Sequence, residues 1–308
     1  MTEDSPLFTE DLPLFSVIIP TYERTAQLGA CLRALASLDY PAGRFEVIVV
    51  DDGSAKPPRE MVEQFRSQLD VRLLEQKNKG PAGARNFGAA RAAGEFLAFT
   101  DDDCEPDSGW LRALAARFKG TPDRMIGGRT LNALPHNPYS ETSQAIIEVV
   151  YAHYNADPDD ARFFASNNFA LPVARFRELG GFDEAFTTSE DRDLCARWRS
   201  RGLRLAYAPE AVVRHSHQLT LRTLWHQHFG YGRGALRFQR SRAARGEGRF
   251  RPDPAFYFGL LRWPASRARG IRAARLASLL LWSQAANVAG FFYEKYWSDG
   301  TSQSEETG

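Results

Sequence analysis

The feature that most constrains the fold is an alternation of short apolar strands with helical segments over the first 120 residues. Four apolar runs rich in β-branched residues read as buried strands, FSVIIP (15–20), FEVIVVDDGS (45–54), VRLLEQ (71–76) and EFLAFTDD (95–102). Helical spacing of apolar residues marks the segments after them, TAQLGACLRALASL, PREMVEQFRSQL, GPAGARNFGAARAAG and SGWLRALAARF. This order predicts parallel βαβ units, and so an α/β fold with an open, mostly parallel central sheet flanked by helices.

The pattern loosens after Arg129. We expect a helix in SETSQAIIEVVYAHY (140–154), a strand in NNFALP (167–172) and a short helix in VARFREL. Ser189 with the acidic residues after it predicts a helix start, and LRLAYAPEAVVRHSH predicts two short strands. The chain from Thr220 onward is expected to be helical. The predicted organisation is an N-terminal tail (1–13), an α/β domain (14–217) and an Arg-rich helical extension (218–308).

Acidic side chains follow two of the predicted strands. Asp52 follows the second strand, and three consecutive carboxylates, Asp101, Asp102 and Asp103, follow the fourth. Ligands of open α/β sheets bind outside the carboxyl ends of the strands. Asp101 and Asp103 share a face and can converge on a hard cation, Mg²⁺ or Mn²⁺, with a nucleoside diphosphate as its partner. The alternative, a solvated acidic turn, stays open on these residues alone.

Three further groups are candidates for ligand contacts. Asp52 with Thr21 and Tyr22 can accept or donate hydrogen bonds at the same sheet edge, although DDGS is also a common turn. Arg85 lies in the glycine-rich GPAGARNFG and offers a planar fork to phosphate, or is simply a surface residue at a helix start. His215 ends a predicted strand and is a candidate third metal ligand, although a lone His is more often structural.

Glu190 and Asp191 lie in the first turn of a predicted helix. The helix dipole favours ionised carboxylates there, so one of them can serve as a general base toward a hydroxyl group. Taken alone, the simpler explanation is an acidic first turn that only complements the dipole.

Charge and composition exclude several classes of protein. A net charge of +1 gives no case for nucleic acid as a partner, and three scattered cysteines without a CxxC pair favour neither a disulfide framework nor structural zinc. The acidic N-terminus lacks the apolar run of a signal peptide, and no clean apolar stretch reaches the length of a membrane span. We therefore expect a cytoplasmic protein.

The ordered motifs resemble one family. SVIIPTYERTAQL, VIVVDDGS, GPAGARNFGAARAAGEFLAFTDDD, NNFALP, GGFDEAFTTSEDRDLCARWRSRG and APEAVVRH together are similar to the family 2 glycosyltransferases, over about residues 14 to 217. The resemblance implies the GT-A fold, transfer with inversion of configuration, and a nucleotide-diphosphate sugar as donor, most naturally of UDP.

The resemblance also implies roles for individual residues. Those that match the nucleoside- and donor-binding positions are Pro20, Thr21, Tyr22, Glu23, Asp52, Arg85 and Asp102. Asp102 and Asp103 match the donor and metal segment, whose DxD begins at Asp101, and we expect Asp101 and Asp103 to be the pair that binds the metal. His215 matches a histidine near the diphosphate or metal, and Asp191 next to Glu190 matches the catalytic base. Asn167 and Asn168 are candidate acceptor contacts, and the acceptor expected by analogy is a glycan or a lipid-linked sugar of the cell envelope.

Other functions fit less well. A nucleotidyltransferase would need a glycine-rich basic loop after the first strand, whereas PTYERTAQ has no glycine, and DDDCE does not match the DxDx[TV] of haloacid-type phosphatases. The remaining alternative is a catalytically degenerate relative that only binds nucleotide or glycan.

The C-terminal extension raises a separate question. Arginines are dense between residues 212 and 275, and LASLLLWSQAANVAGFFYEKYW follows them. Such helices are typical of peripheral contact with the cytoplasmic face of a membrane, but they can equally cover the α/β domain or join two copies in a homodimer.

Overall fold

The computed structural model describes residues 12–247 and 254–297, and the chain divides into two compact units. The first unit comprises residues 1–131, 157–184 and 194–216, and the second comprises 132–156, 185–193 and 217–308. The boundary after residue 216 lies next to the predicted end of the α/β domain, and the second unit also takes in two earlier segments. Most of the predicted tail, and Arg249 and Arg251 of the Arg-rich run, lie outside the described residues.

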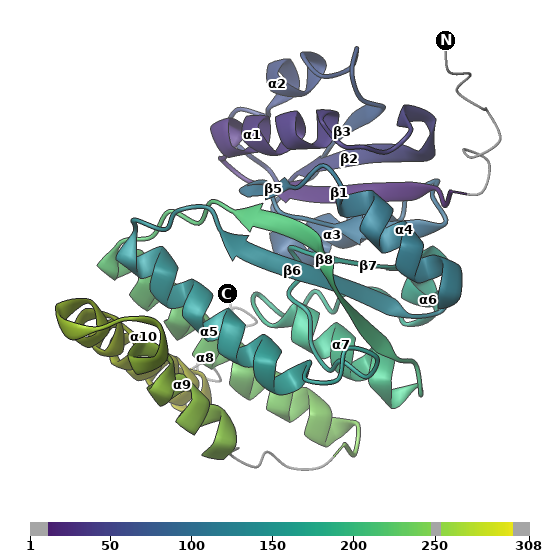
Figure 1. Ribbon diagram of the computed structural model, residues 1–308. Helices are drawn as coiled ribbons and strands as arrows, with labels where there is room; N and C mark the ends of the chain where they lie inside the picture. Colours follow the sequence, from purple (N-terminus) through teal and green to yellow (C-terminus); the bar gives the residue numbers. More distant parts are fainter. Residues whose placement is uncertain (1–11, 248–253, 298–308) are drawn as a thin grey trace, which may run out of the picture. The chain divides into compact units, whose positions relative to one another are not determined.

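The first unit is built on an eight-stranded sheet of order β3-β2-β1-β4-β7-β6-β8-β5 (Figure 1). Its strands are β1 (Phe15–Thr21), β2 (Phe45–Asp51), β3 (Val71–Glu75), β4 (Phe96–Phe99), β5 (Cys104–Pro106), β6 (Met125–Asn132), β7 (Phe169–Pro172) and β8 (Leu205–His215). The first four strands in sequence are parallel neighbours, whereas β7 runs antiparallel to β4 and β6, and β5 runs antiparallel to β8. The predicted α/β sheet is confirmed, with the expected parallel strands in the half formed by β1 to β4 and antiparallel pairings in the other half.

The helices of the first unit cover both faces of the parallel strands. They are α1 (Thr25–Ala36), η2 (Ala42–Arg44), α2 (Arg59–Glu63), α3 (Gly80–Ala89), α4 (Trp110–Gly120) and α6 (Val173–Glu178). Val17 and Ile19 of β1 belong to the same buried cluster as the apolar stripes of α1 and α4. Ile18 points to the opposite face, where a Cβ at Gly88 of α3 would come within 2.8 Å of it. The glycine lets α3 lie directly on the sheet.

Three local predictions differ from the structure. The segment 205–215 is one continuous strand, β8, where two short strands were expected, and it has a neighbour on each side in the sheet, β6 and β5. PREMVEQFRSQL forms only the five-residue α2, followed by turns. Strands β5 and β6 were not predicted, because one has three residues and the other contains Gly127 and Gly128.

The second unit is helical. Its elements are α5 (Pro138–Tyr154), α8 (Leu221–Ala244), α9 (Pro254–Arg267) and α10 (Gly270–Tyr296), and the first residues of α7 (Glu190–Ser200) also belong to it. The helices form a layered group in which α10 packs along α8 (Figure 1). Buried Glu294 of α10 accepts hydrogen bonds from Arg233 (2.7 Å) and Arg237 (2.6 Å) of α8. Among the described residues, no helix combines the length and apolar character that crossing a bilayer requires.

We expect the second unit to lose stability in mild acid through His228 of α8. Its side chain is 2% exposed, its Nε2 has no hydrogen-bond partner among the described residues, and burial lowers its pKa to about 4. The unfolded chain binds this proton near pH 6.5, so the free energy of unfolding is unaffected above that pH. It should then fall by about 3 kcal/mol as the pH drops from 6.5 to 4.

Urea unfolding of the wild type and of His228→Gln across this pH range checks the expectation. The variant carries no titrating group at this position and should show a flatter pH dependence. Equal slopes for the two proteins would contradict the assignment to His228.

Candidate functional site

The carboxyl ends of the parallel strands meet at one edge of the sheet in the first unit. Thr21 at the end of β1 is in register with Asp51 at the end of β2, and Ile18 is in register with Phe99 at the end of β4. Because Asp101, Asp102 and Asp103 follow β4 directly, all three emerge at this edge beside the loop after β1. The expectation from the strand pattern, that the acidic residues gather at one edge, therefore holds for this cluster.

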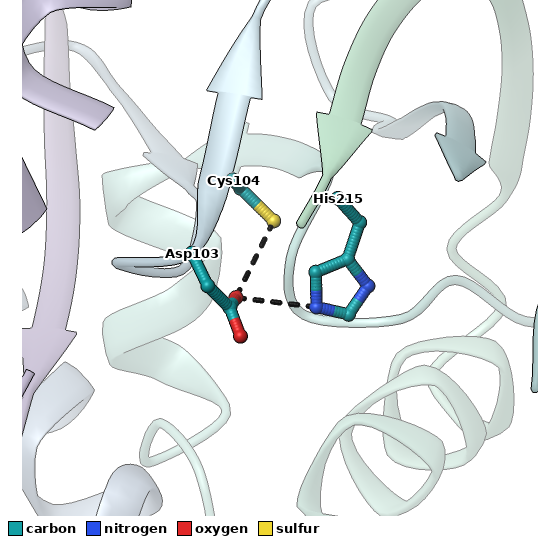
Figure 2. Close-up of side chains that lie close together, drawn as sticks. All are labelled: Asp103, Cys104 and His215. Atoms are coloured by element: carbon teal, nitrogen blue, oxygen red, sulfur yellow. Dashed lines mark hydrogen bonds and ion pairs between the residues drawn. The ribbon is translucent and has the colours of Figure 1, made fainter. Parts of the chain in front are cut away.

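Asp103 lies against His215, as Figure 2 shows. The Nε2 atom of His215 is 3.2 Å from Oδ1 of Asp103, because β5 and β8 pair antiparallel with Cys104 opposite His215. The backbone N–H of Ser216 also donates to the Asp103 carbonyl at 2.8 Å. Burial opposes protonation of His215, but the hydrogen bond and charge of Asp103 outweigh it and raise the pKa of the imidazole.

Cys104 is the third member of this group. One ligand atom from each of Asp103, Cys104 and His215 lies within 4.8 Å of the other two (Figure 2). Burial, followed by the charges of Asp101 and Asp103, raises the pKa of the Cys104 thiol well above its ordinary value. The sulfur therefore stays protonated and is a weak ligand in comparison with the carboxylate and the imidazole.

Asp102 is held by the loop that follows β1. Its carboxylate accepts from the Thr21 hydroxyl (2.7 Å) and from Nη1 of Arg24 (3.3 Å). Burial raises the pKa of Asp102 to about 6, against the opposing effects of the Arg24 charge and the Thr21 hydrogen bond. Asp102 is thus engaged within the protein, as is usual for a buried carboxylate.

Arg24 bridges two of the three aspartates. It also reaches Asp103 at 3.0 Å, and its side chain stays 47% exposed. Burial lowers the pKa of the Arg24 guanidinium, but the charges of Asp102 and Asp103 outweigh that effect and raise it. The arginine therefore supplies positive charge to the carboxylates from the solvent side.

Asp101 pairs with a buried arginine. Nη2 of Arg85 on α3 is 2.6 Å from Oδ1 of Asp101, and its guanidinium lies 5.7 Å from the centre of the Phe182 ring. The predicted helix of GPAGARNFG thus carries Arg85 to the strand edge, beside the first aspartate rather than on the surface.

The loops after β1 and β2 hold the remaining predicted donor residues. Asp52 accepts hydrogen bonds from the Gln76 side chain (2.7 Å) and from the backbone N–H groups of Lys79 (2.9 Å) and Gly80 (2.8 Å). These hydrogen bonds to the Asp52 carboxylate stabilise the loop that leads into α3. Pro20 is half-buried and Tyr22 is exposed.

Glu23 has a positive φ of 56°, which is uncommon for a residue with a side chain. Its carboxylate accepts from the backbone N–H of Ala55 at 2.6 Å, and its own N–H donates to the Ser54 hydroxyl at 2.8 Å. These bonds join the first loop to the DDGS turn and stabilise the strained backbone.

The two predicted acceptor residues have different surroundings. The side-chain amide of Asn168 is fully buried, accepts a hydrogen bond from Trp110 Nε1 at 2.9 Å and donates one to the Ala211 carbonyl at 3.0 Å. These bonds give Asn168 a structural role. Asn167 lies beside Thr130, whose hydroxyl is 3.3 Å from its Oδ1.

Glu190 and Asp191 occupy the start of α7, within the second unit. The predicted helix start is confirmed at Glu190, and Ser189 before it has a φ of 71°, in the left-handed region. Such strain costs about 1–3 kcal/mol and clusters at functional sites. The carboxylate of Asp191 accepts from the backbone N–H of Arg192 at 2.7 Å, whereas Asp193 is buried and pairs with Arg245 at 2.8 Å.

The side chains around Asp103 suit a hard divalent cation. A carboxylate and an imidazole already face each other, and the two other carboxylates stand next to them in the chain. Carboxylate oxygens are the ligands preferred by Mg²⁺ and Mn²⁺. Among the described residues, the three aspartates pair with Arg24, Arg85 and His215. With His215 neutral, as a metal ligand must be, this cluster has a formal charge of −1. Negative charge that exceeds its local partners favours a cation.

Sequence reasoning missed Arg24 and Cys104. A signal for Arg24 was present, since it follows the first strand in PTYER, at the edge where the carboxylates were expected. No local signal marked Cys104, because its position depends on the pairing of β5 with β8.

Two family models match the chain. Glycosyl transferase family 2 matches residues 16–174, and Glycosyl transferase family group 2 matches residues 100–296. The chain is also similar to the pre-mycofactocin glycosyltransferase of Mycobacterium tuberculosis, with 32% identity over 67% of this chain and 43% of that protein. Validoxylamine A glucosyltransferase of Streptomyces hygroscopicus subsp. jinggangensis is 30% identical over 63% of this chain and 53% of its own length. The chain thus spans about half the length of these relatives.

Solved structures share the fold at lower identity. The mannosyltransferase PcManGT of Pyrobaculum calidifontis, in complex with GDP-Man and Mn²⁺, has a TM-score of 0.66 at 19% identity, over 92% of this chain and 88% of that one. Residues 1–349 of TarS from S. aureus have a TM-score of 0.58 at 17% identity, over 93% and 92% of the two chains. The first of these structures holds GDP-Man, and TarS residues 1–349 were also solved in complex with UDP-GlcNAc, so the fold is common to structures that bind nucleotide sugars.

Proposed function

The chain belongs to glycosyl transferase family 2, and on that basis we propose that it transfers a sugar from a nucleotide-diphosphate sugar to an acceptor hydroxyl, with inversion at the anomeric carbon. The observation that carries the proposal is the cluster of Asp101, Asp102 and Asp103 with His215 at the carboxyl edge of the sheet. The similar PcManGT structure was solved with GDP-Man and Mn²⁺, and TarS with UDP-GlcNAc.

We assign the residues of this edge to the donor. Asp103 and His215, with Asp101, would hold Mg²⁺ or Mn²⁺, which when bound neutralises the diphosphate and makes it a better leaving group. Arg85 and Arg24 offer guanidinium groups to the phosphates. The nucleoside would be lined by Thr21, Asp52 and the loop around Tyr22 and Glu23.

Asp191 is the proposed general base, with Glu190 beside it. Its carboxylate takes the proton from the acceptor hydroxyl, whose oxygen forms the new bond to the anomeric carbon as the bond from that carbon to the diphosphate oxygen breaks. A single displacement of this kind inverts the configuration and needs no nucleophile on the protein. We expect a glycan or lipid-linked acceptor, with Asn167 as a contact.

Calorimetric titration with UDP, GDP and dTDP, with and without Mn²⁺, tests the donor assignment. Tight binding of one nucleotide, UDP by expectation, should require Mn²⁺ and be lost in Asp103→Ala. Asp39→Ala removes an exposed carboxylate that pairs with Arg112 of the same unit, and should bind as the wild type does.

Two outcomes would contradict the proposal. Equal nucleotide binding with and without Mn²⁺ would contradict the proposed role of the metal in donor binding. No nucleotide binding by the folded protein would favour a degenerate relative without donor activity.

A further inference from the structure

Helix α10 carries an apolar stripe on the side that faces away from its helical neighbours. At 3.6 residues per turn, eight positions lie within about 100° of one another. Seven of them carry apolar or aromatic side chains and one is Ser278: Ile271, Ala274, Ser278, Leu281, Ala285, Val288, Phe292 and Tyr296. All eight side chains are exposed, among them Ile271 at 89% and Tyr296 at 62%. The buried residues of α10, such as Leu276, Leu280 and Glu294, lie on the opposite side.

The neighbouring helix α9 adds to this surface. Phe258 and Leu261 are exposed on it, and the guanidinium of Arg262 lies 5.4 Å from the centre of the Phe258 ring. At the other edge of the stripe, the ring of Trp282 contacts that of Trp225 of α8, with ring centroids 4.7 Å apart and the ring planes tilted by 50°. The two tryptophans, with Leu221 and Arg222, line an open groove of about 440 Å³. Contiguous exposed apolar surface of this kind marks an interaction site.

The charge of α9 and α10 favours an anionic lipid surface over a second copy of the chain as the partner. Residues 254–293 contain five arginines and no acidic residue, which gives this segment a formal charge of +5. Arg267 and Arg272 lie near Glu148 and Glu141 of α5. Arg262, Arg269 and Arg275 are exposed around the α9–α10 corner. A second copy that docked through the same stripe with the two helices parallel would bring two such basic segments together, which is unfavourable, whereas anionic lipid complements them in any orientation of the helix.

We propose that α9 and α10 form a membrane-binding face that docks on anionic lipid, with the apolar stripe inserted among the acyl chains and the arginines at the phosphates. The stripe runs the length of a 27-residue helix, about 40 Å, so α10 lies in the plane of the interface. Packing of its other side on α8 keeps that side out of the lipid. Exposed Trp282, Tyr293 and Tyr296 belong to the residue types that favour the boundary between lipid and water.

Co-sedimentation of the full chain with lipid vesicles tests this face. The chain should bind vesicles of phosphatidylcholine with phosphatidylglycerol, and bind vesicles of phosphatidylcholine alone far more weakly. Val288→Glu with Phe292→Glu should lower the partition coefficient at least about tenfold. Arg269→Ser with Arg275→Ser should lower it about fivefold for each charge at low salt. The matched control, Lys119→Ser with Arg201→Ser, removes the same charge from exposed positions of the first unit and should bind as the wild type does.

The results of these experiments distinguish binding to lipid from formation of a dimer. Circular dichroism first establishes that each variant keeps the helical content of the wild type, which we expect because all substituted side chains are exposed. Equal vesicle binding by the wild type and Val288→Glu/Phe292→Glu would overturn the proposal. The proposal would also be overturned if the wild type did not bind anionic vesicles and formed a dimer in analytical ultracentrifugation that is absent in this double variant.

Discussion

Replacement of Asp191 with Asn is expected to lower kcat by about 10²- to 10⁴-fold, the usual contribution of a general base. The amide keeps the size of the side chain and can still accept the hydrogen bond that the Arg192 backbone donates to Asp191 at 2.7 Å. It cannot take the acceptor proton. Donor binding should therefore persist, and the measurement is kcat for sugar transfer together with the Kd for nucleotide by calorimetry.

Asp193→Asn separates a catalytic effect from a structural one. Asp193 is two residues further along α7, fully buried, and paired with Arg245 at 2.8 Å. Loss of this pair should lower the free energy of unfolding, because it leaves Arg245 without this partner charge. Asp191→Asn should leave stability nearly unchanged. Retained turnover in Asp191→Asn would overturn the base assignment, and loss of nucleotide binding together with turnover would show a structural role instead.

Replacement of Gly290 with Ala is expected to destabilise the second unit by about 3 kcal/mol, at the upper end of overpacking effects. Helices α8 and α10 pack backbone against backbone at two glycines. A Cβ at Gly290 would lie 1.9 Å from the carbonyl oxygen of Phe229, and one at Gly232 would lie 1.9 Å from that of Asn287. A backbone cannot yield as a flexible side chain does, so the helices must separate and the bonds from Arg233 and Arg237 to Glu294 must lengthen.

Gly259→Ala on α9 is the matched control for this substitution. A Cβ there would meet only Val149, at an ordinary contact distance of 3.6 Å. Because alanine favours a helix over glycine, this variant should be equal to the wild type or more stable by about 0.5–1 kcal/mol. Urea unfolding monitored by circular dichroism compares the two. A Gly290→Ala protein as stable as Gly259→Ala would show that the two helices do not meet at Gly290.

The parallel half of the sheet was predictable because its pattern is local. Strands buried on both faces, such as β1 and β2, are continuous apolar runs, and the helices between them carry one apolar stripe each. The antiparallel half was harder. β5 has three residues and is a strand only through its pairing with β8, and the glycines of β6 give no strand signal. A segment that becomes a strand because of its partner leaves little trace in its own composition.

The sequence by itself determined the α/β class, the family, and the position of the aspartates at the carboxyl end of β4, because strand and helix periodicity and motif order are properties of neighbouring residues. Tertiary structure decided which side chains meet. The contact of Asp103 with His215, the bridge from Arg24 to two aspartates, and the backbone contact at Gly290 join segments that are distant in sequence or lie on separate elements. Periodicity places a side chain on a face of its own element. The pairing of elements then determines which side chain it faces, and that pairing depends on the packing of the whole unit.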